Sequence, residues 1–258
     1  MLSDFREKLI LITGASAGVG WQAARDFAAQ GARLMLAARR RDRLENLARE
    51  IHSQGAQAEA LPCDLSDPWS RDRLITGLLT RNLIPDILIN NAGYANSRPF
   101  VKETPADVAR MMAVNYQAAA DLMSAFLPEM IRRGSGAIVN VASTAGRVAM
   151  PNLAAYCASK FALCALTEAV SYELAGSGVT IHLVNPGPID TEFFDAGVWE
   201  GLKSRRMASA SDVSRAMQDA ILHQRLITTV PASRSLLVYL FNVLGPIGRW
   251  AVRRRGAR

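Results

Sequence analysis

"KLILITGASAGVGWQAARDFAAQG", residues 8–31, joins an apolar run to a helix-length segment through a turn rich in glycine. The apolar residues of 8–13 predict a strand buried on both faces, and the pattern of 18–30 predicts a helix. Glycines in such a turn let the chain bend tightly, let backbone N–H groups approach a phosphate, and let the helix pack closely on the strand. They are Gly14, Gly18 and Gly20. Because their spacing departs from G-x-G-x-x-G, a plain strand-to-helix turn remains the alternative to a nucleotide-binding loop.

The rest of the chain repeats this alternation of strand and helix. Further strands are expected at 33–38, 56–62, 86–90, 136–143, 179–186 and 226–231. Helices are expected at 41–54, 68–80, 104–131, 154–175 and 211–223. The alternation predicts an α/β fold of the Rossmann type, a doubly wound parallel sheet of about seven strands with helices on both faces. No linker divides the 258 residues, so we expect a single dinucleotide-binding domain over 1–258.

The composition is that of a folded globular protein, with 50% apolar and 21% charged residues. Its formal charge of +7 includes two arginine clusters, at 39–43 and 253–258. Such clusters indicate a phosphate or an anionic surface as partner, although a solvated basic face is the commoner explanation of any single run. Nucleic acid is not expected, because no aromatic residues are interleaved with the arginines and no nucleic-acid-binding motif occurs.

The cysteines and histidines form no recognisable metal or nucleophile pattern. The three cysteines lack metal-ligand spacing, and the first residues run into a strand-like segment without a secretory signal. They are Cys63, Cys157 and Cys164. We expect reduced thiols, no metal and a cytoplasmic location. Ser143 does not lie in G-x-S-x-G, and the histidines are scattered.

The end of the second predicted strand bears on the choice of cofactor. An acidic residue there would accept a hydrogen bond from the adenosine ribose 2′-hydroxyl of NAD(H). This chain has Ala38 followed by Arg39 and Arg40. A guanidinium grips a 2′-phosphate in bidentate fashion, so the pair favours NADP(H) over NAD(H). The alternative is a pair of surface arginines at the start of a helix.

Two further strand ends are expected at the same cleft, since parallel strands end along one edge of the sheet. Asp64 and Leu65 follow the third strand and are expected beside the adenine ring. The motif NNAG follows the fourth strand and is expected beside the nucleotide, with Asn90, Asn91, Ala92 and Gly93. Asp64 is alternatively the cap of the helix expected at 68–80, although Ser66 and Asp67 are also available for that role.

The stretch "AAYCASKFAL", residues 154–163, places two polar side chains on an apolar helix. Tyr156 and Lys160 stand four positions apart and therefore point the same way. A phenol with a pKa of about 10 is a poor acid or base at neutral pH. A cation at about 4 Å would favour the phenolate by roughly 4 kcal/mol before desolvation opposes it, so we expect Lys160 to lower the pKa of Tyr156. Cys157 diverges from Tyr156 by about 100° and is expected to be a packing residue.

Two other polar residues complete this candidate site. Ser143 ends the fifth predicted strand, at a distance that a strand-to-helix loop can close, and is expected to hold a substrate oxygen. Asn115 lies inside an apolar helical run and needs a polar partner. On its own, Asn115 is better explained as an ordinary buried asparagine whose polar groups are satisfied.

Taken together, these motifs resemble the short-chain dehydrogenase/reductase family, in an NADP(H)-preferring, single-domain form. The resemblance rests on TGASAGVG, NNAG, Asn115, Ser143, YCASK and NPGPIDT, in this order over residues 8–191. It implies an oxidoreductase that transfers a hydride between a nicotinamide and a carbonyl or alcohol carbon. It also implies a homodimer or homotetramer.

The resemblance further implies roles for individual residues. Tyr156 would be the acid in reduction and the base in oxidation, Lys160 would lower its pKa and hold the nicotinamide ribose, and Ser143 would bind the reacting oxygen. Asn115 would anchor a water relay from Lys160 to solvent. The implied cofactor contacts also include two further sets: Ser16, Ala17 and Val19 in the glycine turn, and Pro186, Gly187, Ile189 and Thr191 at the nicotinamide end.

The C-terminal part carries less information. Phe193, Phe194 and Trp199 predict an apolar wall for a lipophilic substrate, or else surface aromatics under a loop. The segment at about 235–258 is apolar and then basic, is too short to span a bilayer, and is broken by a Gly-Pro pair. It is expected to pack on a dimer partner or on the active-site mouth, or to lie peripherally at a membrane surface.

The leading hypothesis is therefore an NADP(H)-dependent oxidoreductase acting on a lipophilic ketone, aldehyde or secondary alcohol. One alternative is a 3-oxoacyl thioester reductase whose acidic carrier protein docks on the basic surface. An alternative of another class is a non-catalytic NADPH-binding or membrane-associated scaffold protein. The complete set of Asn115, Ser143, Tyr156 and Lys160 argues against a mere binder, which needs no proton donor.

Overall fold

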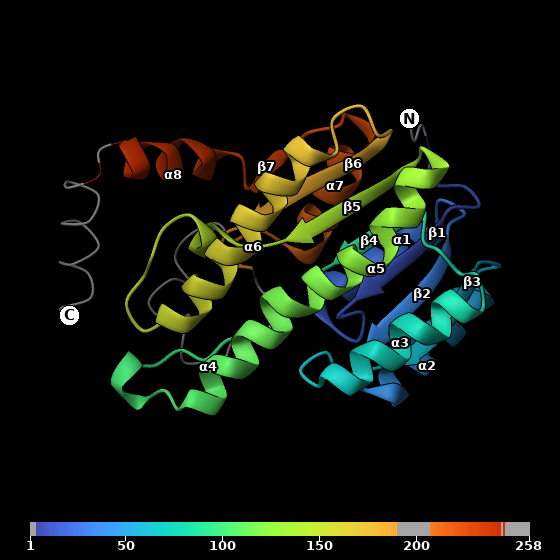
Figure 1. Ribbon diagram of the computed structural model, residues 1–258, viewed down its shortest axis with the longest axis horizontal. Helices are drawn as coiled ribbons and strands as arrows, with labels where there is room; N and C mark the ends of the chain where they lie inside the picture. Colours follow the sequence, from blue (N-terminus) through green and yellow to red (C-terminus); the bar gives the residue numbers. More distant parts are fainter. Residues whose placement is uncertain (1–3, 190–206, 244, 246–258) are drawn as a thin grey trace.

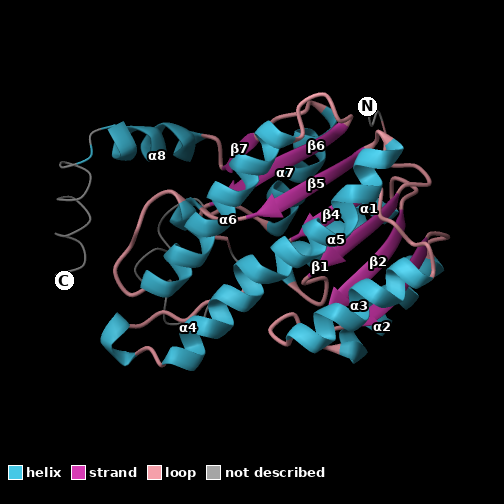
Figure 2. Ribbon diagram, in the orientation of Figure 1, coloured by secondary structure: helices cyan, strands magenta, loops and turns pink. Residues whose placement is uncertain are grey.

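Parallel strands form one sheet in the order β3-β2-β1-β4-β5-β6-β7, shown in Figures 1 and 2 for a computed structural model of the chain. The structure describes residues 4–189, 207–243 and 245. The strands are β1 Leu9–Thr13, β2 Arg33–Ala38, β3 Gln57–Pro62, β4 Ile87–Asn90, β5 Gly136–Val141, β6 Val179–Pro186 and β7 Ile227–Val230. The predicted doubly wound Rossmann-type sheet is confirmed, and the strand order reverses between β1 and β4.

Helices cover both faces of this sheet (Figure 2). One face carries α1 Gly18–Ala28, α2 Arg41–Ser53 and α7 Ala210–Leu222. The other carries α3 Pro68–Thr80, α5 Ala118–Arg133 and α6 Ala154–Glu173. Every expected strand and helix is present, with ends that differ by a few residues at most except in the segment 104–131.

The first strand shows why its apolar run is continuous. Ile10 and Ile12 belong to the core between the sheet and α1, while Leu11 belongs to the core on the opposite face, and all three are fully buried. Successive side chains of a strand point to opposite faces, so a strand covered on both sides needs apolar residues at every position. The carboxyl end of β1, where the glycine turn begins, is therefore held between two hydrophobic cores.

The segment expected to be one helix over 104–131 is divided in three. It contains α4 Pro105–Met112, a π-helical turn Ala113–Gln117 and then α5. The capping box of Thr104 and Asp107 fixes the start of α4. A π-turn holds an extra residue and commonly accompanies a functional site, a feature that helical periodicity does not reveal. Asn115 lies at the centre of this turn.

A helix that was not expected, α8 Ser233–Val243, follows β7 in the C-terminal part. Its residues fall in the segment predicted to be apolar and then basic. In the described ranges, no helix is both long and apolar enough to cross a membrane.

Candidate active site

The glycine turn after β1 has a backbone conformation that residues with a side chain could adopt only with strain or a clash. Gly14 and Gly18 adopt positive φ angles, of 68° and 55°. A Cβ added to Gly20 would lie 2.4 Å from the carbonyl oxygen of Gly14 and 2.6 Å from Nδ2 of Asn91. Ala17 precedes α1 without a side-chain capping bond, so the first N–H groups of this helix are available to an anion. The turn is therefore a cradle of the kind that fits a pyrophosphate, and the nicotinamide dinucleotide predicted from the sequence fits it.

A hydrogen-bond clamp between β1 and β4 holds this cradle. The backbone N–H of Asn91 donates to Oγ1 of Thr13 (3.0 Å), and its side-chain amide donates to the carbonyl oxygen of Thr13 (2.9 Å). The N–H of Ala92 donates to the same hydroxyl oxygen (3.1 Å). Asn91 thus shapes the cradle through its polar groups. Thr13 was not singled out from the sequence, because a threonine ending a strand carries no distinctive signal.

Asn90 points away from the expected nucleotide position. Its side-chain amide is buried and donates to Oδ1 of Asn140 (2.8 Å), whose own amide donates to Oγ1 of Thr167 (2.8 Å). Neighbouring residues of a strand face opposite sides of a sheet, so Asn90 enters the core below α6. The expectation that Asn90 lies beside the nucleotide is therefore wrong.

The two arginines after β2 have different surroundings. Nε of Arg40 donates to Oγ of Ser16 (3.1 Å), and its Nη2 donates to the carbonyl oxygen of Ser16 (3.4 Å). These bonds tie the end of β2 to the glycine turn. Arg39 is exposed, and its charge acts on the carboxyl of Asp64. The structure thus brings both arginines and Ser16 to the carboxyl edge of the sheet.

Asp64 lies at the end of β3 and accepts two hydrogen bonds from Ser66, from the backbone N–H (2.9 Å) and the hydroxyl (2.7 Å). Burial opposes ionisation of this carboxyl, but the bonds from Ser66 and the charge of Arg39 outweigh burial and hold its pKa below the usual range. Asp67, rather than Asp64, caps α3.

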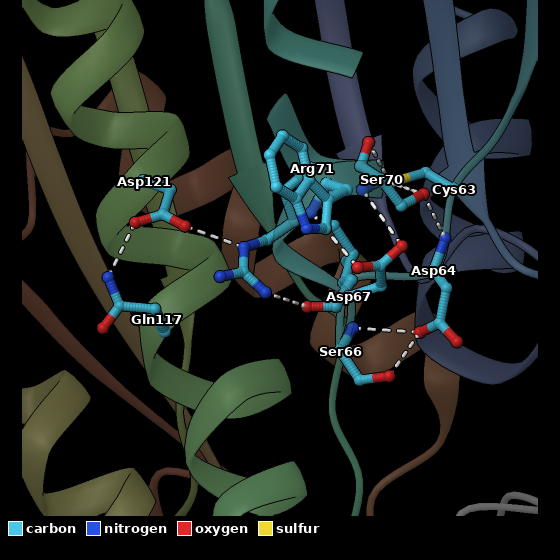
Figure 3. Close-up of polar contacts among 10 residues, drawn as sticks. Cys63, Asp64, Ser66, Asp67, Ser70, Arg71, Gln117 and Asp121 are labelled. Atoms are coloured by element: carbon cyan, nitrogen blue, oxygen red, sulfur yellow. Dashed lines mark hydrogen bonds and ion pairs between the residues drawn. The ribbon is translucent and has the colours of Figure 1, made fainter. Parts of the chain in front are cut away.

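A buried arginine fixes the backbone beside Asp64, as Figure 3 shows. Nη1 of Arg71 donates to the carbonyl oxygen of Leu65 (2.8 Å), and its Nε donates to Oδ2 of Asp121 on α5 (2.7 Å). Gln117 donates to the other carboxylate oxygen of Asp121 (2.7 Å). The expected adenine side of the cleft is thereby anchored to α5. Arg71 was not singled out from the sequence, where it is one of many arginines on helices.

Ser143 and Tyr156 lie together at the carboxyl end of β5. The side chains of the two residues are hydrogen-bonded, and Oγ of Ser143 also lies 3.4 Å from the carbonyl oxygen of Pro186 at the end of β6. Tyr156 is only 5% exposed, and burial raises the pKa of its phenol despite the bond to Ser143. The hydroxyl is therefore a neutral proton donor held beside a second hydroxyl.

Lys160 lies one turn further along α6, buried, with Nζ donating to the carbonyl oxygen of Val141 (2.8 Å). Burial lowers the pKa of its ammonium to about 8. The expected lowering of the phenol pKa by Lys160 is not found. Burial is the largest influence on both groups and disfavours the charged form of each.

Both the oxygen and the nitrogen of the Asn115 side-chain amide make hydrogen bonds. Its Oδ1 accepts from the backbone N–H of Tyr94 (2.7 Å), and its Nδ2 donates to the carbonyl oxygen of Tyr94 (2.8 Å) and to Oγ of Ser159 (2.9 Å). Ser159 in turn donates to the carbonyl oxygen of Tyr156 (2.8 Å). The π-turn is thus joined to the turn of α6 that carries Tyr156. Ser159 lies in YCASK but was not assigned a role from the sequence.

The expected nicotinamide end contains one residue that the motifs did not indicate. A Cβ on Gly187 would lie 2.8 Å from Cδ of Arg234, so the arginine side chain lies directly over this glycine. Ile189 bridges to Ala208 and packs against the core under α7. Thr191 lies outside the described residues, as do Phe193, Phe194 and Trp199.

The surroundings of Tyr156 are apolar. One buried cluster contains the tyrosine with Met111, Ala145, Leu153, Ala155 and Cys157, and Tyr94, Ala95, Val108 and Met150 pack against it. Cys157 is buried in this cluster, as expected for a packing residue, and none of the three cysteines is in a disulfide. An apolar cavity of about 550 Å³ adjoins the cluster at Met150 and Cys157, but Tyr156 and Ser143 do not line it.

Comparison with known proteins agrees with this geometry. Residues 8–198 match the family model described as short chain dehydrogenase. A fatty acyl-CoA reductase of Mycobacterium tuberculosis is 41% identical over 180 residues, which cover 68% of this chain and 61% of that protein. The chain spans 58% to 61% of the length of three of the curated relatives that it matches.

Solved structures are similar over nearly the whole chain. A short-chain dehydrogenase of Sphingobium yanoikuyae in complex with NADPH has a TM-score of 0.82 at 29% identity and covers 93% of this chain and 95% of that one. A short chain dehydrogenase/reductase of Burkholderia phymatum in complex with NAD has a TM-score of 0.83 at 26% identity, with 94% and 95% covered. From its fold, its glycine cradle and these matches, the chain belongs to the short-chain dehydrogenase/reductase family of NAD(P)-dependent oxidoreductases.

Proposed function

We propose that the protein is an NADP(H)-dependent oxidoreductase that interconverts a lipophilic carbonyl compound and its alcohol, with Tyr156 as acid and base. The observation that carries this proposal is the buried, neutral Tyr156 hydroxyl, hydrogen-bonded to Ser143 at the carboxyl edge of the sheet. A proton donor and an oxygen-binding hydroxyl held together beside a pyrophosphate cradle are what carbonyl reduction requires.

The preference for NADP(H) rests on the end of β2. Arg39 is exposed there and Arg40 is bonded to the glycine turn, so two guanidinium groups flank the expected position of the adenosine ribose. Ala38 stands where a carboxylate would repel a 2′-phosphate. Solved relatives are complexed with NADPH or with NAD, so membership of the family does not decide between the two cofactors. The preference for NADP(H) is inferred from the two arginines.

Ser143 and Tyr156 have separate roles in the proposed reduction. When bound, the reduced nicotinamide supplies the hydride. Ser143 positions the carbonyl oxygen of the substrate, and Tyr156 donates its phenolic proton to that oxygen as negative charge develops on it. One hydride at carbon and one proton at oxygen convert the carbonyl to an alcohol. In the reverse direction Tyr156 takes up the alcohol proton.

Lys160 and Asn115 support this exchange. Lys160 has a pKa near 8 and can therefore exchange a proton close to neutral pH. The hydrogen bonds of Asn115 and Ser159 fix the first turns of α6, so they set the direction in which Tyr156 and Lys160 point. We propose Lys160 as the group that holds the nicotinamide ribose and returns a proton toward Tyr156 from solvent.

The apolar residues around Tyr156 support a lipophilic substrate. Met111, Leu153 and Ala145 are buried against it, and a charged substrate group at this position would have no described partner among them. The similarity to a fatty acyl-CoA reductase supports an acyl thioester as a second candidate class. A non-catalytic NADPH-binding scaffold protein is disfavoured, because it would not need Ser143 bonded to a buried Tyr156.

A matched panel of ten-carbon probes tests the proposal: decanal, 2-decanone, decanoyl-CoA and 3-oxodecanoyl-CoA. NADPH consumption is followed by absorbance, and each product is identified by mass spectrometry. We expect decanal or 2-decanone to be reduced to its alcohol. Reduction of the two thioesters alone would favour the acyl thioester alternative, and NADPH binding without turnover of any probe would overturn the proposal.

We also propose a cytoplasmic homodimer or homotetramer. Phe161 and Tyr172 are exposed on α6, at 41% and 72%, on the same side of the helix as several exposed alanines. A second copy of the chain would cover such a surface. Light scattering of the purified protein measures this, and a monomer at micromolar concentration would contradict it.

A further inference from the structure

Helix α8 exposes an apolar stripe to solvent. Leu236, Leu240 and Val243 are 64%, 43% and 61% exposed. Their spacing of four and three residues places them on one face of the helix. Three large aliphatic side chains left in water on one face indicate a surface with a partner.

The helix lies at the margin of the protein. Among the described elements it packs on β7, and Figure 1 shows it extending away from the sheet at the end opposite to α2 and α3. It also lies beyond residues 8–198, the part that matches the family model. The stripe therefore lies outside the part of the chain that the family model covers.

The charge of the same segment is strongly biased. From residue 233 to the C-terminus the sequence holds six arginines and no aspartate or glutamate. Arg234 lies in α8, whereas Arg249, Arg253, Arg254, Arg255 and Arg258 lie outside the described residues. A positive charge of this density complements an anionic surface. It opposes the approach of a second identical segment, because both segments would carry arginines and no acidic residue of their own.

We infer that α8 forms a docking surface for an anionic phospholipid membrane, and that the basic sequence after it supplies the charge attraction. The helix has 11 residues, so at about 1.5 Å per residue it is far shorter than a bilayer of roughly 30 Å. It would lie in the plane of the interface, with Leu236, Leu240 and Val243 in the acyl region, and the positive charge of the sequence after Val243 would attract anionic head groups. This inference does not depend on the reaction that the protein catalyses.

Vesicle flotation of the full-length protein tests the inference. Phosphatidylcholine vesicles with and without phosphatidylglycerol are compared at low and high salt. Leu236→Glu and Val243→Glu alter the stripe, and Arg253→Gln/Arg254→Gln/Arg255→Gln removes three charges. Leu79→Glu is the matched control, because Leu79 is also an exposed leucine on a helix, at 39%, but on α3.

We expect binding to the anionic vesicles that weakens with salt. Each stripe variant should weaken it about tenfold, and the triple arginine variant roughly a hundredfold. Leu79→Glu should bind like the wild type. Equal binding to neutral vesicles, no binding to anionic ones, or unchanged binding of Leu236→Glu would overturn the inference. So would a stripe variant that dissociates an oligomer in light scattering while its flotation stays unchanged.

Discussion

The side-chain amide of Asn115 donates to the hydroxyl of Ser159 across 2.9 Å, and this contact joins the π-turn before α5 to the start of α6. Ser159 extends this contact to Tyr156, because its hydroxyl donates a hydrogen bond to the backbone carbonyl of Tyr156. The position of the proposed acid therefore depends on a residue that lies 41 positions earlier in the chain.

Loss of this contact is expected to lower turnover and stability together. Ser159→Ala should cost about 1 kcal/mol of unfolding free energy, and Asn115→Ala about 2 to 3 kcal/mol, because the latter leaves the backbone groups of Tyr94 unpaired. Both variants should lower kcat more than they change KM. Urea unfolding and steady-state kinetics measure these effects. If the double variant loses the sum of the two single losses, the residues are not coupled as the structure indicates.

Substitution of glycine by alanine is expected to have opposite effects in the glycine cradle and in α3. Gly20→Ala should abolish cofactor binding and destabilise the fold, because its Cβ would lie 2.4 Å from a carbonyl oxygen that cannot move freely. Gly77→Ala is the control: no atom lies within 4 Å of its Cβ, and it lies in α3. This variant should gain up to about 1 kcal/mol of stability. Thermal unfolding with and without NADPH measures both, and cofactor-dependent stabilisation of Gly20→Ala would contradict the cradle.

The burial of Lys160 is expected to make the unfolding free energy of the protein depend on pH. Its pKa is lowered from 10.5 to about 8 by burial. Below pH 8 the folded chain carries the whole cost of a buried ammonium. Between these two values only the unfolded chain binds the extra proton, so raising the pH stabilises the folded state, by up to about 3 kcal/mol.

Lys160→Met removes this dependence. Its stability relative to the wild type should therefore be highest below pH 8 and should fall as the pH approaches 10.5. The buried thiols and Tyr156 have raised pKa values and act in the opposite direction above pH 9. Cys63, Cys157 and Tyr156 cancel in this comparison, whereas Cys164 does so only in part, because the charge of Lys160 lowers its pKa. Urea unfolding across the window measures the difference, and a difference that does not vary with pH would show that Lys160 is not buried as a cation.

Arg39 predicts the choice of cofactor. Arg39→Ala should weaken NADPH binding about tenfold or more and leave NADH binding nearly unchanged, because only NADPH carries the 2′-phosphate. Arg41→Ala is a suitable control, since Arg41 is 73% exposed and pairs weakly with Glu45. Fluorescence titration of the wild type and the two variants with both cofactors measures the six dissociation constants. Equal loss for NADH and NADPH would place Arg39 away from the 2′-phosphate.

The sheet and the glycine turn were predictable because their causes are local. Apolar runs such as 9–13 bury both faces of a strand, and the turn after them needs glycines wherever it is placed. The direction of Tyr156 and Lys160 was also predictable from a spacing of four on a helix. Their titration was not, because burial is a property of the assembled fold and is here the largest influence on both pKa values.

Contacts between distant segments account for the other differences. Asn90 was misplaced because a motif does not show which face of the strand its first residue occupies, and here that face meets Asn140. Arg71 and Arg234 escaped notice because their partners, Leu65 and Gly187, meet them only after folding. Asn115 was correctly identified as a residue that needs a partner, but the partner, Ser159, follows from the packing of α6 against the π-turn.

The central claim is that Tyr156 donates the proton to the substrate oxygen, and Tyr156→Phe tests it most directly. The variant keeps the ring in its apolar cluster and removes only the hydroxyl that bonds Ser143. We expect kcat for NADPH-dependent reduction of decanal to fall by about 10² to 10⁴, while NADPH binds with unchanged affinity in a fluorescence titration. Turnover by Tyr156→Phe within a few fold of the wild type would contradict the account.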